Sequence, residues 1–411
     1  MSRATMAGPA GRAAASMRAG FAALVLGYVL SQFYRAFLAV LAPTLKRELG
    51  ASPEDLALAS GLWFAVFAAM QIPVGLLLDR VGPRRTAGYL FILGGAGGAA
   101  AFATATSPQG IVLAMALIGV GCAPVLMAAL YIFARVYPPA MFASLAGLLI
   151  GIGSAGNLAA AAPLTWAADA FGWRAAIWIV AAATLVVGAA LLALIHDPGP
   201  PPPSDAEQTG FVALLRQPAL WVMVPLMLVC YGPAAGIRGL WAGPYFADVF
   251  GLDDARIGVL TLWMALAMVL GNFAYGPLDR LLGTRKWVIV GGNLAVASCL
   301  GLLALWPAAS PGRSALLLAG VGFFGASYPM IMAHGRAFFP HHLAGRGVTL
   351  VNLMGIGGAG LLQIASGRLF AAAEGRPEAV PASGYAAIFL FFAALVLVGS
   401  VIYTLSQDRL D

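Results

Sequence analysis

Long apolar runs that carry almost no charge dominate this chain. Of its 411 residues, 61% are hydrophobic and only 9% are charged, whereas a soluble domain carries about 25% charged residues. Runs of about 20 apolar residues are long enough to cross the hydrocarbon core of a bilayer as helices. Because lipid offers the backbone no hydrogen-bond partners, such segments must be helical. The sequence therefore predicts an all-α membrane protein.

Breaks that contain charged residues or proline separate twelve such runs. A polar, proline-rich segment at 196–212 divides six runs from six, and we interpret it as a cytoplasmic linker. We therefore expect an N-terminal six-helix bundle over 1–195 and a C-terminal six-helix bundle over 213–411. The expected helices are 19–44, 56–78, 86–106, 110–134, 141–168, 174–195, 218–246, 256–278, 286–306, 313–335, 346–372 and 383–405.

Basic residues are distributed unevenly between the connecting segments. Fourteen Lys and Arg residues fall on the side that holds both termini, and seven fall on the other side. The excess of basic residues in cytoplasmic loops predicts that both termini are cytoplasmic. We expect an integral protein of a bacterial-type inner or plasma membrane. This bias also accounts for the net charge of +7, so we expect no nucleic-acid partner.

The two halves carry the same markers in the same order. The Asp-Arg pair that ends the second run recurs at the end of the eighth run, and the intervals to the next basic marker are nearly equal. Such matching predicts a duplicated six-helix unit, which is a plan that one class of transporters uses. The matched positions are Pro43 with Pro244, Gly50 with Gly251, Asp79 with Asp279, Arg80 with Arg280, Arg135 with Arg336, and Pro138 with Pro340.

The sequence GLLLDRVGPRRT at 75–86 resembles the signature of the major facilitator superfamily. A weaker copy lies at 276–286, and the run at 171–174 is also similar to that family. The resemblance covers the whole chain and implies two pseudo-symmetric six-helix bundles around a central pathway. It also implies secondary transport by alternating access, with a cytoplasmic gate that the two copies stabilise. The expected gating residues are Gly75, Asp79, Arg80, Gly82, Arg84, Arg85, Asp279 and Arg280.

Two arginines, Arg35 and Arg238, lie within otherwise uncharged parts of the first and seventh runs. A central arginine costs about 2.5–3.5 kcal/mol on insertion scales, so its presence indicates a task. In the family, these two helices line the central cavity. A guanidinium group matches a carboxylate, phosphate or nitrate. We therefore expect a small organic or inorganic anion to bind there. The alternative is that each arginine reaches toward the headgroups or binds backbone carbonyls. Aromatic residues expected in the cavity walls are Tyr34, Tyr231, Trp241 and Tyr328.

No Asp or Glu lies clearly within a run. Carboxylates are the usual proton carriers in such proteins, so a proton would have to come with the anion, or a counter-anion would be exchanged. The partners we expect are thus a small molecule or ion, the bilayer and a coupling proton or counter-anion. We expect a monomer and no cofactor. We expect no enzymatic activity, because neither a nucleophile–base pair nor a metal cluster is visible within the runs. No nucleotide-binding loop is visible, so the energy for transport must come from a gradient.

The sulfur-containing residues supply an alternative, which is import of copper or another soft metal. A copper-importing branch of the family has a Met-x-x-x-Met pair in helix 7 and a His-x-x-x-Met pair in helix 8. This chain matches the first pair and has Met264 where the histidine of the second would be expected. Soft sulfur ligands suit Cu(I). Methionines also fill gaps in apolar helices, and we favour that interpretation, so no metal site is expected. A transporter-like membrane sensor is a further, less favoured possibility. The sulfur residues are Met223, Met227, Cys230, Met264 and Met268.

Overall fold

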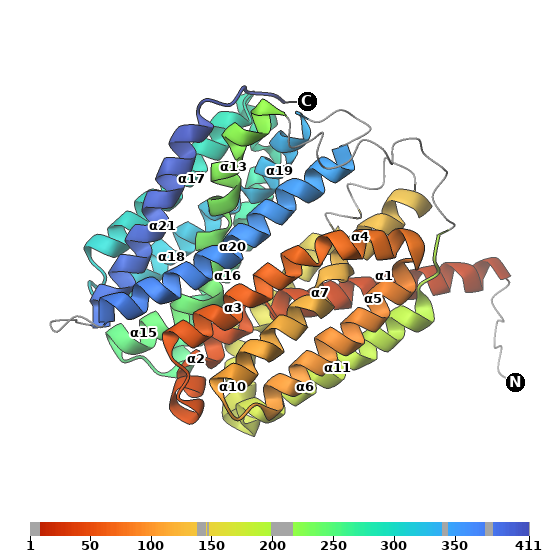
Figure 1. Cartoon of the computed structure of the whole chain (residues 1–411), viewed down its shortest axis with the longest axis horizontal. Helices are drawn as coiled ribbons and strands as arrows, with labels where there is room; N and C mark the ends of the chain where they lie inside the picture. The colour runs from red at the N-terminus through yellow and green to blue at the C-terminus, as the bar shows by residue number, and fades with distance from the viewer. Residues whose placement is uncertain are drawn as a thin grey trace, which may run out of the picture.

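A computed structural model describes residues 9–137, 145, 148–198, 217–338, 344–374 and 381–410, and all the regular elements among them are helices (Figure 1). Ten of these helices are long and apolar enough to cross a membrane. Two further helix pairs, bent by 43° and 41°, bring the number to twelve if each pair is one span. The predicted all-α membrane fold is confirmed.

The N-terminal half contains the helices up to α11. The bent pairs are α1 with α2, and α10 with the helical residues before it, Leu148–Ala159. The bounds are α1 Pro9–Phe33, α2 Phe37–Leu49, α3 Pro53–Ala69, α4 Gln71–Arg80, α5 Pro83–Leu90, η1 Phe91–Ala96, α6 Gly97–Thr104, α7 Pro108–Val136, α9 Ala155–Ala159, α10 Ala162–Phe171 and α11 Trp173–Leu194.

The C-terminal half contains the helices from α13 onward. Its first span is interrupted twice, by a break at Tyr231 and by a π-helical segment, η3. The bounds are α13 Pro218–Cys230, α14 Gly232–Gly236, η3 Ile237–Trp241, α15 Ala242–Phe250, α16 Asp254–Leu282, α17 Lys286–Leu305, α18 Pro311–Gly325, α19 Tyr328–Arg336, α20 Ala344–Glu374 and α21 Pro381–Tyr403.

The two halves form a V in Figure 1. We use the name 'termini end' for the end of the molecule that holds the two chain termini. The opposite end is called the far end. The halves meet where α2, α3 and α15 lie, and they diverge toward the termini ends of α1, α4, α13 and α19. Most of the expected linker, 199–212, lies outside the described residues.

Small residues allow the halves to approach closely. A Cβ atom added at Gly61 of α3 would lie 2.8 Å from the carbonyl oxygen of Gly360 on α20, and one added at Gly239 of η3 would lie 2.7 Å from the carbonyl oxygen of Arg35. Since lipid provides no hydrophobic driving force between helices, close backbone packing of this kind holds membrane helices together. The helices α3 and α20 form the most extensive contact between the halves, and α2 packs against both η3 and α15.

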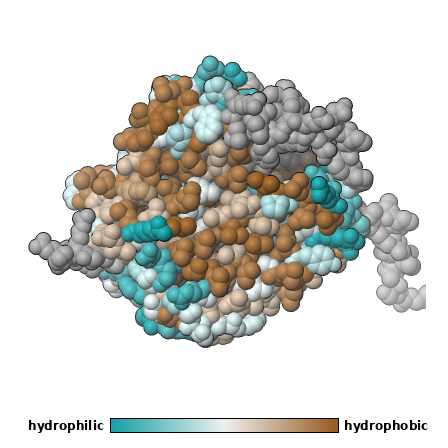
Figure 2. Space-filling view, viewed as in Figure 1, coloured by the Kyte–Doolittle hydropathy of each residue, from teal (hydrophilic) through white to brown (hydrophobic). Residues whose placement is uncertain are grey.

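Two ion pairs also cross between the halves at the far end. Lys46 of α2 lies 3.5 Å from Asp248 of α15, and Arg47 lies 3.7 Å from Asp254 of α16. Each pair is partly exposed, so its contribution to stability is at most about 1 kcal/mol. Figure 2 shows apolar side chains across the middle of the visible face and polar ones toward its ends, as expected for a protein surrounded by lipid.

Candidate functional site

Arg35 lies at the interruption between α1 and α2. Residues 34–36 form a turn rather than regular helix, and the two helices bend by 43° around it. The side chain is only 7% exposed. Its Nη1 donates to the Tyr231 hydroxyl of the other half at 3.4 Å, and its Nε atom has no hydrogen-bond partner among the described residues. The guanidinium group is thus inside the protein, between the halves, and only partly satisfied.

Arg238 lies at the corresponding depth of the other half, within η3. Short π-helical segments are rare and frequent at functional sites. The Arg238 side chain is 4% exposed, and neither its Nε nor its Nη1 atom has a partner among the described residues. No carboxylate of the described chain pairs with it or with Arg35. Arg238 therefore carries a charge that this part of the protein leaves uncompensated.

The two arginines come from opposite halves and lie close together. Gly239, which follows Arg238, packs against the carbonyl oxygen of Arg35. Both side chains are buried, so both charges lie in surroundings of low dielectric constant. Burial of a charge costs several kcal/mol unless an opposite charge compensates it. A negative charge between the two halves would therefore stabilise both groups.

Two predicted aromatic residues contact this region. The ring of Tyr231 lies 4.9 Å from that of Tyr328, and Tyr328 donates to the backbone and side-chain oxygens of Asn352 on α20. Both tyrosines are half-buried. Arg35, Tyr231, Tyr328 and Asn352 thus form a continuous series of contacts across the interface between the halves.

The other two predicted aromatic residues point elsewhere. The Tyr34 hydroxyl shares a hydrogen bond of 2.8 Å with Thr184 of α11, inside the N-terminal half. The Trp241 indole donates to Ser366 of α20 at 2.9 Å, and its ring packs against Phe370. The structure thus brings Tyr231 and Tyr328 to the arginines but gives Tyr34 and Trp241 separate partners within the two bundles.

Two aromatic residues beside Arg35 were not predicted. Its guanidinium carbon lies 5.4 Å from the ring centre of Trp63 and 5.0 Å from that of Phe67, and the two rings stack at 5.1 Å. Arg–aromatic contacts of this kind contribute about 0.5–2 kcal/mol. The Trp63 N–H is buried and has no partner among the described residues. The site therefore contains three side chains with N–H donors that lack acceptors: Arg35, Arg238 and Trp63.

The predicted gating residues lie at the termini end of the N-terminal half. Asp79 lies 3.8 Å from Arg135 of α7. Gly82 has a φ of 92°, which favours glycine. The backbone N–H of Arg84 donates to Asp197, and the Arg84 side chain contacts the carbonyl oxygen of Leu192. The remaining members are exposed or half-buried and make no side-chain hydrogen bond or ion pair with the described part of the chain: Gly75, Arg80 and Arg85.

The second copy of the motif has a different pairing. Asp279 accepts two hydrogen bonds from Arg285, at 3.0 and 2.8 Å, and both residues are buried. Arg280 is exposed. The side chain of Arg336, which matches Arg135 in the repeat, lies outside the described residues.

The methionine pairs make separate packing contacts. Met223 and Met227 face Gly335 of α19, and Met264 and Met268 face Gly322 of α18. Cys230 is buried and contacts the carbonyl oxygen of Met227. Among the described residues no group of three or more His, Cys, Asp or Glu side chains is arranged to hold a metal ion. The copper alternative is not favoured.

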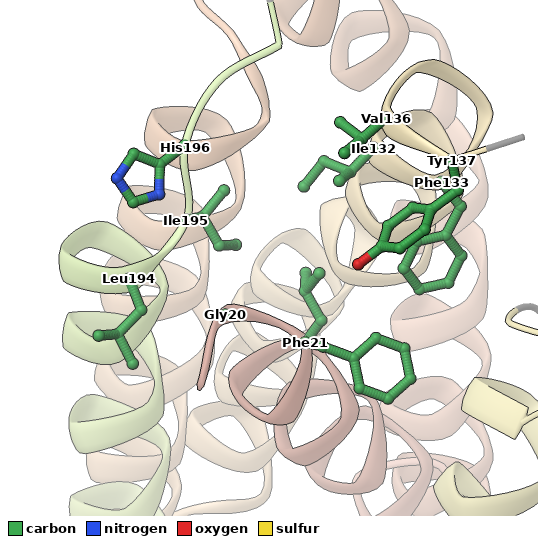
Figure 3. A pocket seen from close by; sticks show the side chains of 10 residues that line it. Gly20, Phe21, Ile132, Phe133, Val136, Tyr137, Leu194, Ile195 and His196 are labelled. Carbon is green, nitrogen blue, oxygen red and sulfur yellow. The ribbon is translucent and has the colours of Figure 1, made fainter. Parts of the chain in front are cut away.

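A cavity of about 310 Å³ lies away from the arginines, between α1, α7 and α11 (Figure 3). Its walls are mainly apolar, with Phe21, Ile132 and Leu194 among them, and the Tyr137 hydroxyl and the His196 ring are its polar side-chain groups. A second cavity, of about 450 Å³, lies at the far end between α2 and α15. Its charged residues Lys46 and Asp248 already pair with each other. Neither cavity has the uncompensated donors found around Arg35 and Arg238.

Fold and site together define a polytopic helical carrier with a charged site between two bundles. Residues 24–241 match the family model described as the Major Facilitator Superfamily, and this match covers more than half of the chain. The chain belongs to the Major Facilitator Superfamily and is a transporter of that family. The prediction made from the motif at 75–86 is confirmed.

The relatives agree with this assignment. A protein of Agrobacterium vitis named "Putative tartrate transporter" is 24% identical over 359 residues, which are 81% of this chain and 79% of the relative. The crystal structure of a bacterial homologue of the human lysosomal transporter Spinster, inward-facing and occupied, has a TM-score of 0.72 at 19% identity and covers 94% of this chain and 96% of that one. A D-xylose-proton symporter has a TM-score of 0.75 at 13% identity, over 95% and 98% of the two chains. These structural likenesses concern the fold alone.

Proposed function

We propose that this protein is a secondary transporter of a small anion, with Arg35 and Arg238 as the groups that bind it. Both termini lie in the cytoplasm in this proposal, as the basic loops indicate. Alternating access requires the halves to rock about the α3–α20 and α2–η3 contacts, so that the site faces each side in turn.

The observation that carries the proposal is the pair of buried, uncompensated guanidinium groups. Two like charges repel each other by about 4 kcal/mol at a distance of about 4 Å and an effective dielectric constant of about 20, so guanidinium groups that face each other are destabilised. An anion between them removes this repulsion and also supplies acceptors for the unpaired N–H groups of Arg35, Arg238 and Trp63. Tyr231 and Tyr328 contribute the wall beside the anion.

An organic dicarboxylate is the substrate class we propose first. Two carboxylates match two guanidinium groups in charge, and each carboxylate accepts the paired N–H donors of one guanidinium fork. The relative named "Putative tartrate transporter" supports the same class. L-tartrate is therefore the first compound to test, and L-threitol, which has the same hydroxylated carbon chain without carboxylates, is its neutral control.

The test is uptake into liposomes that contain the purified protein. We expect uptake of labelled L-tartrate but not of L-threitol. Replacement of either site arginine, Arg35→Gln or Arg238→Gln, should reduce uptake at least 100-fold, because one anion-binding fork is lost. Arg256→Gln is the matched control, since Arg256 is exposed at the far end and pairs only with Asp253 beside it; this variant should keep its uptake.

Folding must be checked in the same variants. Circular dichroism and size-exclusion chromatography should match the wild type, because a polar uncharged residue replaces a costly buried charge. Undiminished uptake by the folded Arg35→Gln or Arg238→Gln protein would reject the proposed site.

A further inference from the structure

A segment that follows α21, residues 406–409, lies across the termini end of the C-terminal half (Figure 1). We call it the C-terminal strap. The Asp408 carboxylate accepts from the backbone N–H groups of Arg285 and Lys286 at 3.1 and 3.0 Å. The guanidinium carbon of Arg409 lies 4.7 Å from the ring centre of Phe338, just beyond α19. The strap is thus attached both to the loop before α17 and to the end of α19.

A buried histidine of α19 holds the middle of the strap. The Gln407 carbonyl oxygen can only accept, so Nε2 of His334 donates to it at 3.0 Å. The other ring nitrogen, Nδ1, then accepts from the hydroxyl of Tyr403, the last residue of α21. The backbone nitrogen of Arg409 lies 3.3 Å from the same Nε2 atom. Because the His334 ring is fully buried, loss of either hydrogen bond would leave a polar group unpaired away from water.

The helix that carries His334 is short and is not continuous with the helix before it. A turn at 326–327 separates α18 from α19, and a few residues at such a break can act as a hinge. The first residue of α19 is Tyr328, whose ring lies against that of Tyr231 beside Arg35. One short helix therefore connects the candidate site with the strap.

The position of α19 bears on the gap between the two halves. The helix packs against α13, α16, α17 and α20, all of which belong to the same half, and it lies at the end where the halves diverge (Figure 1). Alternating access requires this end to close in part of the cycle. A tilt of α19 about the break would change the gap, and the contacts of the strap with the last turn of α19 oppose such a tilt.

We propose that the C-terminal strap is a latch that holds α19 against its own half and thereby keeps the termini ends apart. Release of the latch lets α19 tilt about the break at 326–327. His334 is a positioning residue in this mechanism, because it acts through α19 and touches no substrate. The latch does not depend on which solute the protein carries, so it can be tested without any substrate.

Distances between spin labels on the full chain measure the position of α19 directly. One label replaces Ala333, an exposed residue of α19. Its partner is either at Leu76 of α4, which reports the distance between the halves, or at Leu270 of α16, which reports the place of α19 within its own half. Both leucines are exposed. The native cysteines are first replaced by alanine: Cys122, Cys230 and Cys299.

The wild type should give one distance for each pair of labels. His334→Phe keeps an aromatic ring but removes both hydrogen bonds, and we expect a second population for both pairs. A tilt of about 20° would displace Ala333 by roughly 3 Å, since this residue lies about 10 Å along the helix from the break. Asp408→Ala releases the other attachment of the strap and should give the same second population.

Ser406→Ala is the matched control. Ser406 belongs to the strap, but its buried hydroxyl has no hydrogen-bond partner among the described residues, so this variant should keep the distances of the wild type. A merely structural role of His334 would lower the melting temperature of His334→Phe without adding a second population.

Three outcomes would overturn the latch. One is unchanged distances for both pairs in the folded Asp408→Ala protein, which decides the question even if His334→Phe does not fold. Another is a change in the pair with Leu76 alone, because the halves would then rock without a tilt of α19. The third is a shift in Ser406→Ala as large as that in Asp408→Ala. None of these outcomes bears on the proposed anion site.

Discussion

The two copies of the loop motif at the termini end have the same sequence pattern but different chemistry. In the N-terminal copy, Asp79 is 55% exposed in its side chain and lies 3.8 Å from Arg135, a residue of another helix. In the C-terminal copy, the Asp279 side chain is 12% exposed and lies 2.8 Å from Arg285 within the same motif. Both copies keep the aspartate, but its described partner differs: in the first copy it is a residue of another helix, and in the second it is a residue of the same motif.

The helices that follow the two copies of the motif also differ in how their N-termini are capped. Many helices that start at the far end have their own N-cap: the Ser52 side chain, for example, accepts from the N–H of Asp55, and Ser310 from that of Arg313. The helix α5, which starts at the termini end, has no side-chain cap of its own, whereas at the start of α17 the Thr284 hydroxyl accepts from the N–H of Trp287 at 3.3 Å. An aspartate that follows the sixth span of each half supplies a further acceptor, Asp197 for α5 and Asp408 for α17.

The aspartate of the C-terminal copy accepts more hydrogen bonds than that of the N-terminal copy. Asp408 accepts from the backbone N–H groups of both Arg285 and Lys286 and also contacts the Thr284 hydroxyl, whereas Asp197 accepts from the backbone of Arg84 alone. The comparison indicates that the C-terminal loop is a rigid unit and that the N-terminal loop is the more adjustable one. An adjustable loop suits a gate whose contacts must break and form in each cycle.

The largest effect should come from the buried pair. Asp279→Asn removes the charged acceptor of two hydrogen bonds from the buried Arg285 guanidinium, and we expect a loss of about 3 kcal/mol of stability. Thermal unfolding of the purified protein measures it. Asp79→Asn is the matched variant in the other copy, and a loss as large as that of Asp279→Asn would contradict the contrast between the two loops.

The next largest effect should come from the C-terminal cap. Asp408→Ala removes the acceptor for two N–H groups at the start of α17, and we expect a loss of about 1.5 kcal/mol. Asp197→Ala removes one such acceptor at the start of α5 and should cost about 1 kcal/mol. Thermal unfolding of the two variants in the same detergent gives the comparison. If Asp197→Ala were the more damaging, the N-terminal loop would be the more rigid one.

The Asp408 cap should also depend on pH. Partial burial raises the pKa of this carboxyl group. Hydrogen bonds from Thr284 and from the backbone of Lys286 and Arg285 together lower the pKa by more than burial raises it, so the net shift is downward from 3.8. A depressed pKa means that the stabilisation is present above about pH 4 and is lost as the pH falls through the folded-state value. The stability difference between wild type and Asp408→Ala should thus be full at pH 6 and should shrink below pH 4. A difference that grows on acidification would contradict this sign.

The smallest effect should be that of Asp79→Asn. The pair with Arg135 is largely solvent-exposed and long, so its loss should change stability by about 0.5 kcal/mol or less. Circular dichroism melts at low and high salt provide the measurement, since an exposed pair weakens with ionic strength. A salt-independent loss of several kcal/mol would indicate a buried pair in solution.

Much of the fold was predictable because its signals are local. Apolar runs, the motif at 75–86 and the two arginines can each be identified from a short window of sequence. The Asp197 and Asp408 caps could not be predicted, because each joins residues more than 100 positions apart. Trp63 and Phe67 were missed for the same reason: their spacing of four predicts only that they share a helix face, not that the face meets Arg35.

The aromatic residues next to the arginines show a different limit of prediction from sequence. Tyr34 precedes Arg35, and neighbouring residues in a helix point in directions about 100° apart, so both could not face the same cavity unless the turn at 34–36 redirected one of them. Trp241 lies three residues after Arg238, but a π-helical segment changes the register of side chains within that interval. Helical periodicity alone therefore could not assign Trp241 to the same face as Arg238.

Direct binding tests the central claim most simply, without dependence on transport. Calorimetric titration of the purified protein with L-tartrate should give heat that saturates for the wild type and for Arg256→Gln. At matched ionic strength, the same titration should give no saturable heat for Arg35→Gln, for Arg238→Gln or for L-threitol with the wild type. Saturable binding of the anion by both folded glutamine variants with unchanged affinity would show that the paired guanidinium groups do not hold the substrate.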